Sequence, residues 1–111
     1  MIDLVMTRTS TRYVWLPFRG VEPSTGLVVD ITGAALKAAL VRGADLPGAA
    51  DWVAADHDGE RTINGRAFQL ARVLVGTGGT IEPGPGDWAA WVQVALGDET
   101  VEEPCGTIRV T

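Results

Sequence analysis

The sequence predicts an all-β domain, an antiparallel β-sandwich of about seven strands with an immunoglobulin-like layout. Two apolar runs of strand length, residues 68–75 and 88–96, carry β-branched and aromatic side chains. A connection rich in glycine and proline separates them, which is typical of a turn. Further alternating segments and turn signals recur at the spacing found in such sandwiches. We therefore expect the two runs to be adjacent antiparallel strands in the middle of the fold.

Length and composition predict one globular domain over residues 1–111. The chain is 46% hydrophobic and 21% charged, which suits a packed core. Its net charge of -5 argues against nucleic-acid binding through a basic surface. Cys105 is the only cysteine, so no internal disulfide forms, and we expect it to enter the last strand as a small hydrophobic residue. No run is long enough to span a membrane, and the charged Asp3 and Arg8 argue against a signal peptide.

The N-terminal third predicts three strands. Residues 2–6 alternate and form a short strand, which we place at or near a sheet edge. Residues 12–18 alternate again, with Val14 and Phe18 on one face and Tyr13 on the other. Pro17 removes a backbone donor, which places this strand at an edge. Residues 20–26 are expected to be a loop and residues 27–31 a strand.

The middle of the chain is harder to assign. Residues 34–41 fit a helix by composition, yet they also alternate and are bounded by glycines, and we favour a strand. Residues 44–66 are expected to be the longest irregular region, with residues 56–59 as an exposed turn. Residues 63–65 suit a tight turn. The last segment, 106–111, alternates as a final strand.

The candidate reactive groups do not form a recognisable site. Acidic residues surround the single histidine, His57, but their spacing matches neither a zinc pattern nor a calcium loop. An exposed acidic loop explains them better; the residues concerned are Asp51, Asp56, His57, Asp58 and Glu60. The glycines of residues 76–80 lack the lysine and helix of a phosphate loop, so we expect a hairpin turn. Residues 98–103 suit a solvated acidic loop. We predict no catalytic residue, metal or cofactor, and no enzymatic activity.

The aromatic residues give the strongest functional hint. Trp88 and Trp91 are expected on opposite faces of one strand, so they cannot form a flat platform for stacking on a sugar. At least two of the four tryptophans are expected to pack in the core. Those left outside predict a protein contact, because aromatic residues are enriched in interfaces. The residues we predict for this contact are Tyr13, Trp15, Phe18, Trp52 and Trp91.

A series of strand and turn motifs covers the chain from about residue 29 to its end. They are Asp51-Trp52, residues 71–76 with Gly78-Gly79, residues 86–94, Glu103-Pro104 and residues 106–110. This series resembles small immunoglobulin-like virion proteins of tailed actinobacteriophages, which are distantly similar to the N-terminal domain of phage baseplate upper proteins. The last loop, residues 97–104, departs from the spelling usual in that family.

The resemblance implies a non-enzymatic structural protein of a tailed-phage virion, assembled in the cytoplasm of the bacterial host. Its implied partners are other virion proteins of the capsid, head-to-tail connector or tail, and it would act in many symmetric copies, without direct contact with nucleic acid or membrane. Residues 1–26 would be an edge strand or an arm that docks on a neighbouring subunit. The alternative is a carbohydrate-binding or host-surface recognition module on the same fold.

Overall fold

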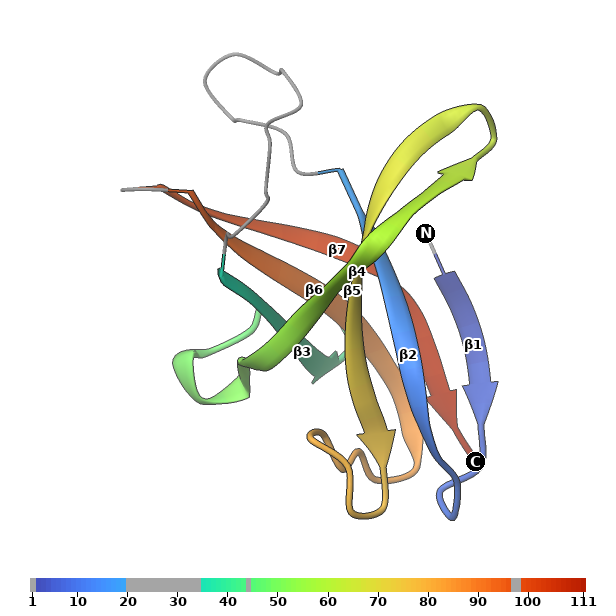
Figure 1. Cartoon of the computed structure of the whole chain (residues 1–111). Coiled ribbons are helices and arrows are strands. Elements are labelled where there is room, and N and C mark those ends of the chain that lie inside the picture. Colours follow the sequence, from blue (N-terminus) through green and yellow to red (C-terminus); the bar gives the residue numbers. More distant parts are fainter. Residues whose placement is uncertain (1, 20–34, 44, 97–98) are drawn as a thin grey trace.

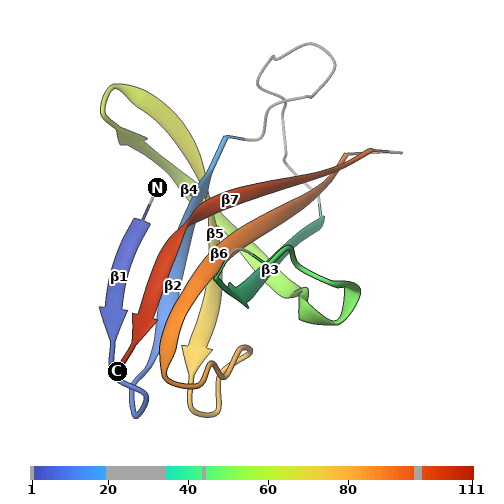
Figure 2. The same cartoon turned by 180° about the vertical axis from the view of Figure 1, so that it is seen from behind.

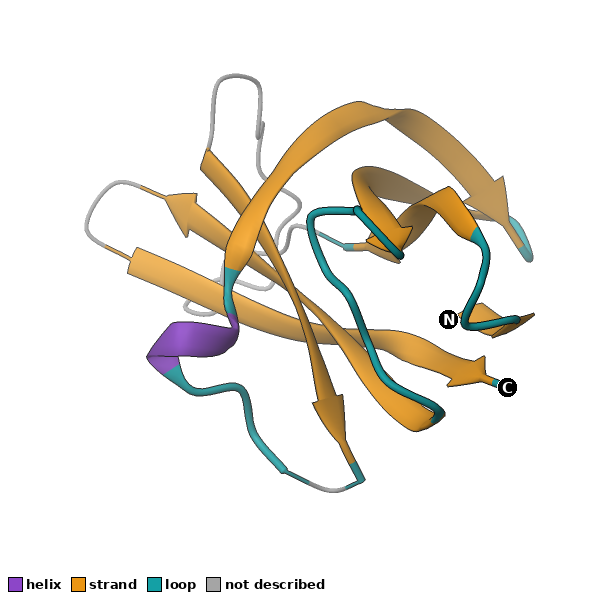
Figure 3. Ribbon diagram, turned by 90° about the horizontal axis from the view of Figure 1, so that it is seen from below, coloured by secondary structure: helices purple, strands orange, loops and turns teal. Residues whose placement is uncertain are grey.

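The computed structural model describes residues 2–19, 35–43, 45–96 and 99–111 (Figure 1). Within these residues the chain forms seven strands and one short 3-10 helix, η1, which lies in the connection from β3 to β4 (Figure 3). The elements are β1 (Ile2–Met6), β2 (Thr11–Phe18), β3 (Ala35–Arg42), η1 (Ala49–Asp51), β4 (Val53–Ile63), β5 (Arg66–Gly76), β6 (Gly86–Leu96) and β7 (Glu99–Val110).

The described strands form one continuous sheet in the order β1-β7-β6-β3-β4-β5-β2. The sheet curls until its two edge strands, β1 and β2, face each other, which gives a nearly closed, barrel-like arrangement (Figures 1 and 2). β4 joins the two halves, because its first residues pair with β3 and its later residues pair with β5. The all-β class and the expected number of strands are confirmed. The two layers of the expected sandwich are thus continuous through β4, and one pair, β1 with β7, is parallel.

The two central runs are strands β5 and β6, but the prediction that they are neighbours is wrong. β5 lies between β4 and β2, whereas β6 lies between β3 and β7. The connection after β5 first folds back on that strand, where Gly79 N–H donates to the Gly76 carbonyl and Ile81 bridges Val75. It then continues to β6 in the other half of the sheet. Turn residues predict a change of direction, but a connection of this length does not fix the partner of the next strand.

Alternating side chains of the strands fill the interior. Phe18, Leu16 and Ile108 are among the largest fully buried side chains. Cys105 is 1% exposed, which confirms its expected packing role. Trp88 packs against the same core from β6. The interior residues come from both halves of the sheet, so one hydrophobic core holds the barrel together.

The predictions for the middle of the chain have different outcomes. The strand predicted at residues 34–41 is confirmed as β3, while the one predicted at 27–31 lies outside the described residues. The irregular region predicted at 44–66 is wrong from Val53 onward, because β4 and β5 form a long hairpin whose tip projects from the barrel (Figure 1). β4 is mostly exposed, so it lacks the apolar alternation that marks a buried strand. Asn64 and Gly65 have positive φ angles of 52° and 78°, which confirms the tight turn.

Strand β7 is longer than predicted. It begins at Glu99 and includes most of the segment expected to be a solvated acidic loop. A bulge in the pairing with β6 lies between the pairs Ala90–Gly106 and Trp91–Pro104. Glu102 is exposed as expected, but Glu103 is half-buried. Pairing with β6 along its whole length therefore overrides the charge of this segment.

Candidate protein-contact surface

The five residues predicted for a protein contact differ in how much of each side chain reaches the surface. Tyr13 is 46% exposed and Trp15 is 37% exposed, both on edge strand β2. Trp52 and Trp91 are half-buried. Phe18 is 0% exposed and belongs to the core, so its prediction as a contact residue is wrong. It lies on the same inward face of β2 as Val14 and Leu16.

Strand register places an arginine and a carboxylate beside the exposed Trp15. Trp15 on β2 is directly opposite Arg72 on β5, and Arg72 is opposite Asp56 on β4. These three side chains form a row across three strands, on the face turned away from the core. Arg72 Nη2 lies 3.4 Å from Asp56 Oδ2, and both groups are partly open to solvent. Such an ion pair contributes about 0–1 kcal/mol to stability, so its main effect is to orient the guanidinium group.

The two aromatic rings are held in place by polar neighbours. Trp15 Nε1 donates a hydrogen bond of 2.6 Å to Asp58 Oδ2. The Arg72 guanidinium carbon lies 4.6 Å from the centre of the Tyr13 ring, within the range of a cation–π contact. The Tyr13 and Trp15 ring centres are 6.4 Å apart and their planes are tilted by 53°. Fixed rings lose less conformational entropy when a partner binds.

We name this surface the aromatic patch and define it by Tyr13, Trp15, Arg72, Asp56 and Asp58. Tyrosine, tryptophan and arginine are the residues most enriched at the energetic centres of protein interfaces. The patch combines all three with two carboxylates that can accept hydrogen bonds at its border. Arg72 Nε is shielded from solvent and has no hydrogen-bond partner among the described residues. The arrangement places two aromatic rings, one cation and two carboxylates together on one preformed surface.

Trp91 and Trp52 lie outside this patch. Trp91 is on β6, between β3 and β7 and on the opposite face from Trp88, as predicted. Its indole Nε1 is buried and finds no partner among the described residues. Trp52 directly precedes β4, next to η1. Of the five residues predicted for a contact, the structure brings Tyr13 and Trp15 together on one surface, and the other three lie elsewhere.

His57 and one of the acidic residues near it, Glu60, are linked by hydrogen bonds through Gln69. His57 Nε2 lies 2.7 Å from Gln69 Oε1, and Gln69 Nε2 donates to Glu60 Oε1 at 2.8 Å. These contacts bridge the irregular pairing of β4 with β5 between His57 and Glu60. No group of three or more potential metal ligands occurs in the part of the chain that the structure describes. Among those residues there is also no helix long and apolar enough to cross a membrane.

Sequence reasoning missed the polar members of the aromatic patch. Arg72 interrupts an apolar run at an outward position, and this interruption was the available signal. Asp56 and Asp58 carried no such signal, because their segment was expected to be an irregular loop. Val5 is a further exposed apolar side chain, with 61% of its surface accessible. The alternation of β1 already places it on the other face of the strand from Ile2 and Leu4.

No family model, curated protein or solved structure matches this chain. The resemblance to phage virion proteins therefore remains a prediction based on the motifs quoted above.

Proposed function

We propose that this chain is a non-enzymatic structural protein of a tailed-phage virion, which contacts capsid, connector or tail proteins through the aromatic patch. The observation that carries a contact role is the pair Tyr13 and Trp15, both exposed and held in fixed positions on an edge strand. The resemblance of the strand and turn motifs supports the virion as the place of action.

The patch is small, so one copy would bind weakly. Stable protein interfaces bury about 800 Å² on each partner, more than a few side chains supply. A particle that displays many copies in fixed positions converts weak pairwise contacts into strong attachment. A weak single contact therefore favours a multicopy or symmetric arrangement in the particle over a single soluble complex.

Carbohydrate or host-surface recognition is the alternative on the same fold. It requires two exposed aromatic rings that lie in one plane, because sugar rings stack on flat aromatic surfaces. The Tyr13 and Trp15 planes are tilted by 53°, which does not meet this requirement. A contact with another protein needs no such flat platform, and the patch therefore favours the structural role.

The proposal is tested on particles of the phage whose genome encodes the chain. Purified particles are denatured, and quantitative mass spectrometry measures the number of copies per major capsid subunit. The proposal expects a fixed ratio corresponding to many copies per particle, unchanged by a second gradient purification. Absence of the chain from purified particles overturns it.

A matched pair of variants tests the aromatic patch. Trp15→Ser combined with Tyr13→Ser removes both exposed rings, and incorporation into particles should fall at least tenfold. The control is Val5→Ser combined with Leu46→Ser, which removes two other exposed apolar side chains. Equal loss in both double variants would contradict a specific role for the patch, provided that circular dichroism shows both proteins folded.

A further inference from the structure

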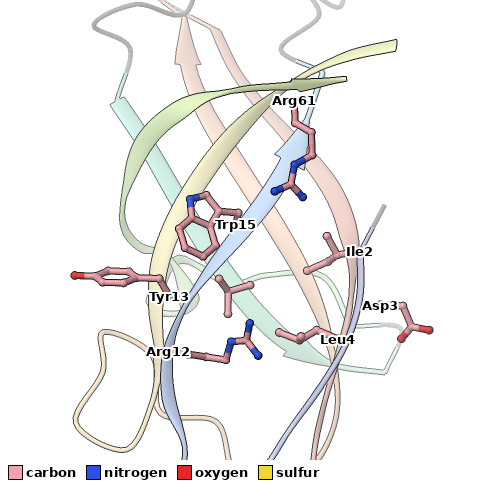
Figure 4. Close-up of a pocket in the computed structure, with 8 residues that line it drawn as sticks. Ile2, Asp3, Leu4, Arg12, Tyr13, Trp15 and Arg61 are labelled. Atoms are coloured by element: carbon pink, nitrogen blue, oxygen red, sulfur yellow. The ribbon is translucent and has the colours of Figure 1, made fainter. Parts of the chain in front are cut away.

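The barrel has an open seam where its two edge strands face each other. β1 and β2 are the ends of the described sheet, and no described residue pairs with the outer side of either strand. A cleft of about 460 Å³ lies along this seam. Figure 4 shows that β1 and β2 form its walls and that a side chain from β4 reaches over it. Its lining residues are Ile2, Asp3, Leu4, Arg12, Tyr13, Val14, Trp15 and Arg61.

Hydrogen bonds identify which backbone groups of β2 face the seam. The Leu74 carbonyl accepts from Ile81 N–H, so the backbone groups of Leu74 point away from β2. Tyr13 is its register partner and forms the matching non-hydrogen-bonded pair. Tyr13 therefore turns its own N–H and C=O toward the seam, and alternation along the strand does the same for Trp15. Pro17 occupies the next such position, where its missing N–H costs no hydrogen bond within the sheet.

The edge of β1 is open in the same way. The Met6 carbonyl accepts from Thr111 N–H at 2.9 Å, so the even-numbered residues of β1 turn toward β7. The N–H and C=O groups of Asp3 and Val5 consequently point to the seam. Exposed edges of this kind are templates for another extended chain, which supplies the missing hydrogen-bond partners.

Charge indicates what kind of chain would fit. The guanidinium groups of Arg12 and Arg61 reach into the cleft from opposite ends of the seam (Figure 4). Neither is among the ion pairs of the described residues, which join Arg72 to Asp56 and Arg109 to Asp87. Asp3 points out of the cleft and accepts a hydrogen bond from Thr107 Oγ1. The seam is thus locally cationic in a chain whose net charge is -5.

We propose that the seam binds an extended acidic segment of a partner protein, which adds as a strand to the free edge of β2. The side chains of the bound segment that face the cleft would be acidic near Arg12 and Arg61. Between these two arginines they would be apolar and would lie over Leu4 and Val14. This inference rests on the proposed function, because it names the kind of virion partner and the way in which it attaches. Backbone hydrogen bonds supply affinity in this mode, and the two arginines supply the preference for acidic sequences.

The test uses a synthetic peptide, acetyl-TETVTET-amide, with the full-length chain. NMR should show progressive shifts of the Tyr13 and Trp15 backbone amides, and fluorescence anisotropy of labelled peptide gives the dissociation constant. The lysine analogue, TKTVTKT, should bind at least tenfold more weakly. Two further analogues carry N-methyl groups on alternate residues, and at least one of them should lose binding tenfold, since one alternating set of N–H groups faces β2.

Protein variants separate the charge from the backbone contribution. Arg12→Gln with Arg61→Gln should weaken peptide binding threefold to tenfold, while the charge-matched control Lys37→Gln with Arg66→Gln should leave it unchanged. Tyr13→Pro removes the ring and the N–H that faces the seam, whereas Tyr13→Thr removes only the ring. Tyr13→Pro should therefore bind at least threefold more weakly than Tyr13→Thr, with both proteins folded by circular dichroism.

Three results would overturn the seam proposal. The first is no change in the NMR shifts of the Tyr13 and Trp15 amides at millimolar peptide, and the second is equal affinity for the lysine analogue. The third is a dimer in sedimentation that forms through the β2 edge, because a second copy would then occupy the seam. If the peptide does not bind but the chain is present in purified particles, only the seam proposal is overturned. If the peptide binds but the chain is absent from particles, the virion proposal is overturned and the seam remains a peptide site.

Discussion

The Glu103 carboxylate in β7 is linked to the end of β2 because both of its oxygens share the backbone N–H of Arg19, at 2.9 and 3.0 Å. Arg19 directly follows β2, and Glu103 lies in β7, on the other side of the seam. The bulge between the Ala90 and Trp91 pairs makes this contact possible, because the extra residue in β7 changes which face the preceding side chains occupy. Glu103 therefore closes one end of the seam and leaves the part beside β1 open.

Removal of this contact should loosen the barrel. Glu103→Ala is expected to lower the free energy of unfolding by about 1–2 kcal/mol, because the Arg19 N–H loses a charged acceptor. The exposed neighbour Glu102 offers the control, since its own hydrogen bond joins Gln93 within the paired strands β6 and β7. Urea unfolding measures both variants, and hydrogen exchange should show faster exchange of the Arg19 amide in Glu103→Ala alone. An equal loss of stability in both variants would contradict the role of Glu103 at the seam.

Gly106 allows β1 to pair closely with β7. Its φ angle is 138°, and a Cβ atom at this position would lie 2.1 Å from the Ile2 carbonyl oxygen. Gly106→Ala should therefore displace β1 and cost more than about 2 kcal/mol. Gly65→Ala is the control, because Gly65 also has a positive φ of 78° but a Cβ there meets nothing within 4 Å. The control should cost about 1 kcal/mol from backbone strain alone. Thermal unfolding that ranks the two variants in the reverse order would refute this explanation.

Cys105 should make stability fall in alkaline solution. Burial raises the pKa of its thiol from 9.0 to about 12, and the Glu103 carboxylate adds to the rise. Between these values the thiol ionises only in the unfolded chain, so stability present below pH 9 is lost as the pH rises toward 12. The loss is about 1.4 kcal/mol per pH unit. Urea unfolding between about pH 8 and 10.5 should show a steeper decline for the natural chain than for Cys105→Ala. The same pH dependence in both proteins would exclude the thiol as the cause.

Trp15 should contribute more of the tryptophan emission that a soluble quencher can reach than Trp88 does. It is 37% exposed, whereas Trp88 packs on the core and donates its indole N–H to the Gly84 carbonyl at 2.8 Å. Acrylamide quenching should therefore decrease clearly in Trp15→Phe and little in Trp88→Phe. Asp58→Ala removes the acceptor of the Trp15 indole and should lower the fluorescence anisotropy that Trp15 contributes. If all four tryptophans resisted quenching in the isolated chain, the aromatic patch could not be a contact surface.

Local patterns predicted the strands better than their order in the sheet. Alternation of apolar and polar residues identified β2, an apolar run of strand length identified β5, and Asn64-Gly65 marked the hairpin turn. These signals are properties of neighbouring residues, so a single sequence contains them. The separation of β5 from β6 depends on a connection whose path is set by packing across the barrel. β4 and the start of β7 were missed because pairing with neighbouring strands holds polar segments such as Asp56 to Glu60 in extended form.

The candidate site was predicted only in part for a related reason. Tyr13 and Trp15 followed from alternation on an edge strand, and the same alternation should have removed Phe18 from the contact set. Arg72 lies opposite Trp15 through strand register, and Asp58 reaches Trp15 from the irregular part of β4. A single sequence contains neither the register nor the irregularity. The seam depends on the same long-range order, since β1 and β2 follow each other in the chain but are opposite ends of the sheet.

Oxidative footprinting measures directly whether the aromatic patch is covered in the particle. Hydroxyl radicals modify exposed Trp15 and Tyr13 in the isolated chain, and mass spectrometry compares their rates with those in purified particles. A contact through the patch should give at least fivefold protection of both residues in particles, with little change at exposed Leu46 as the internal reference. Equal labelling of Trp15 and Tyr13 in the free and particle-bound chain would contradict a contact through this surface.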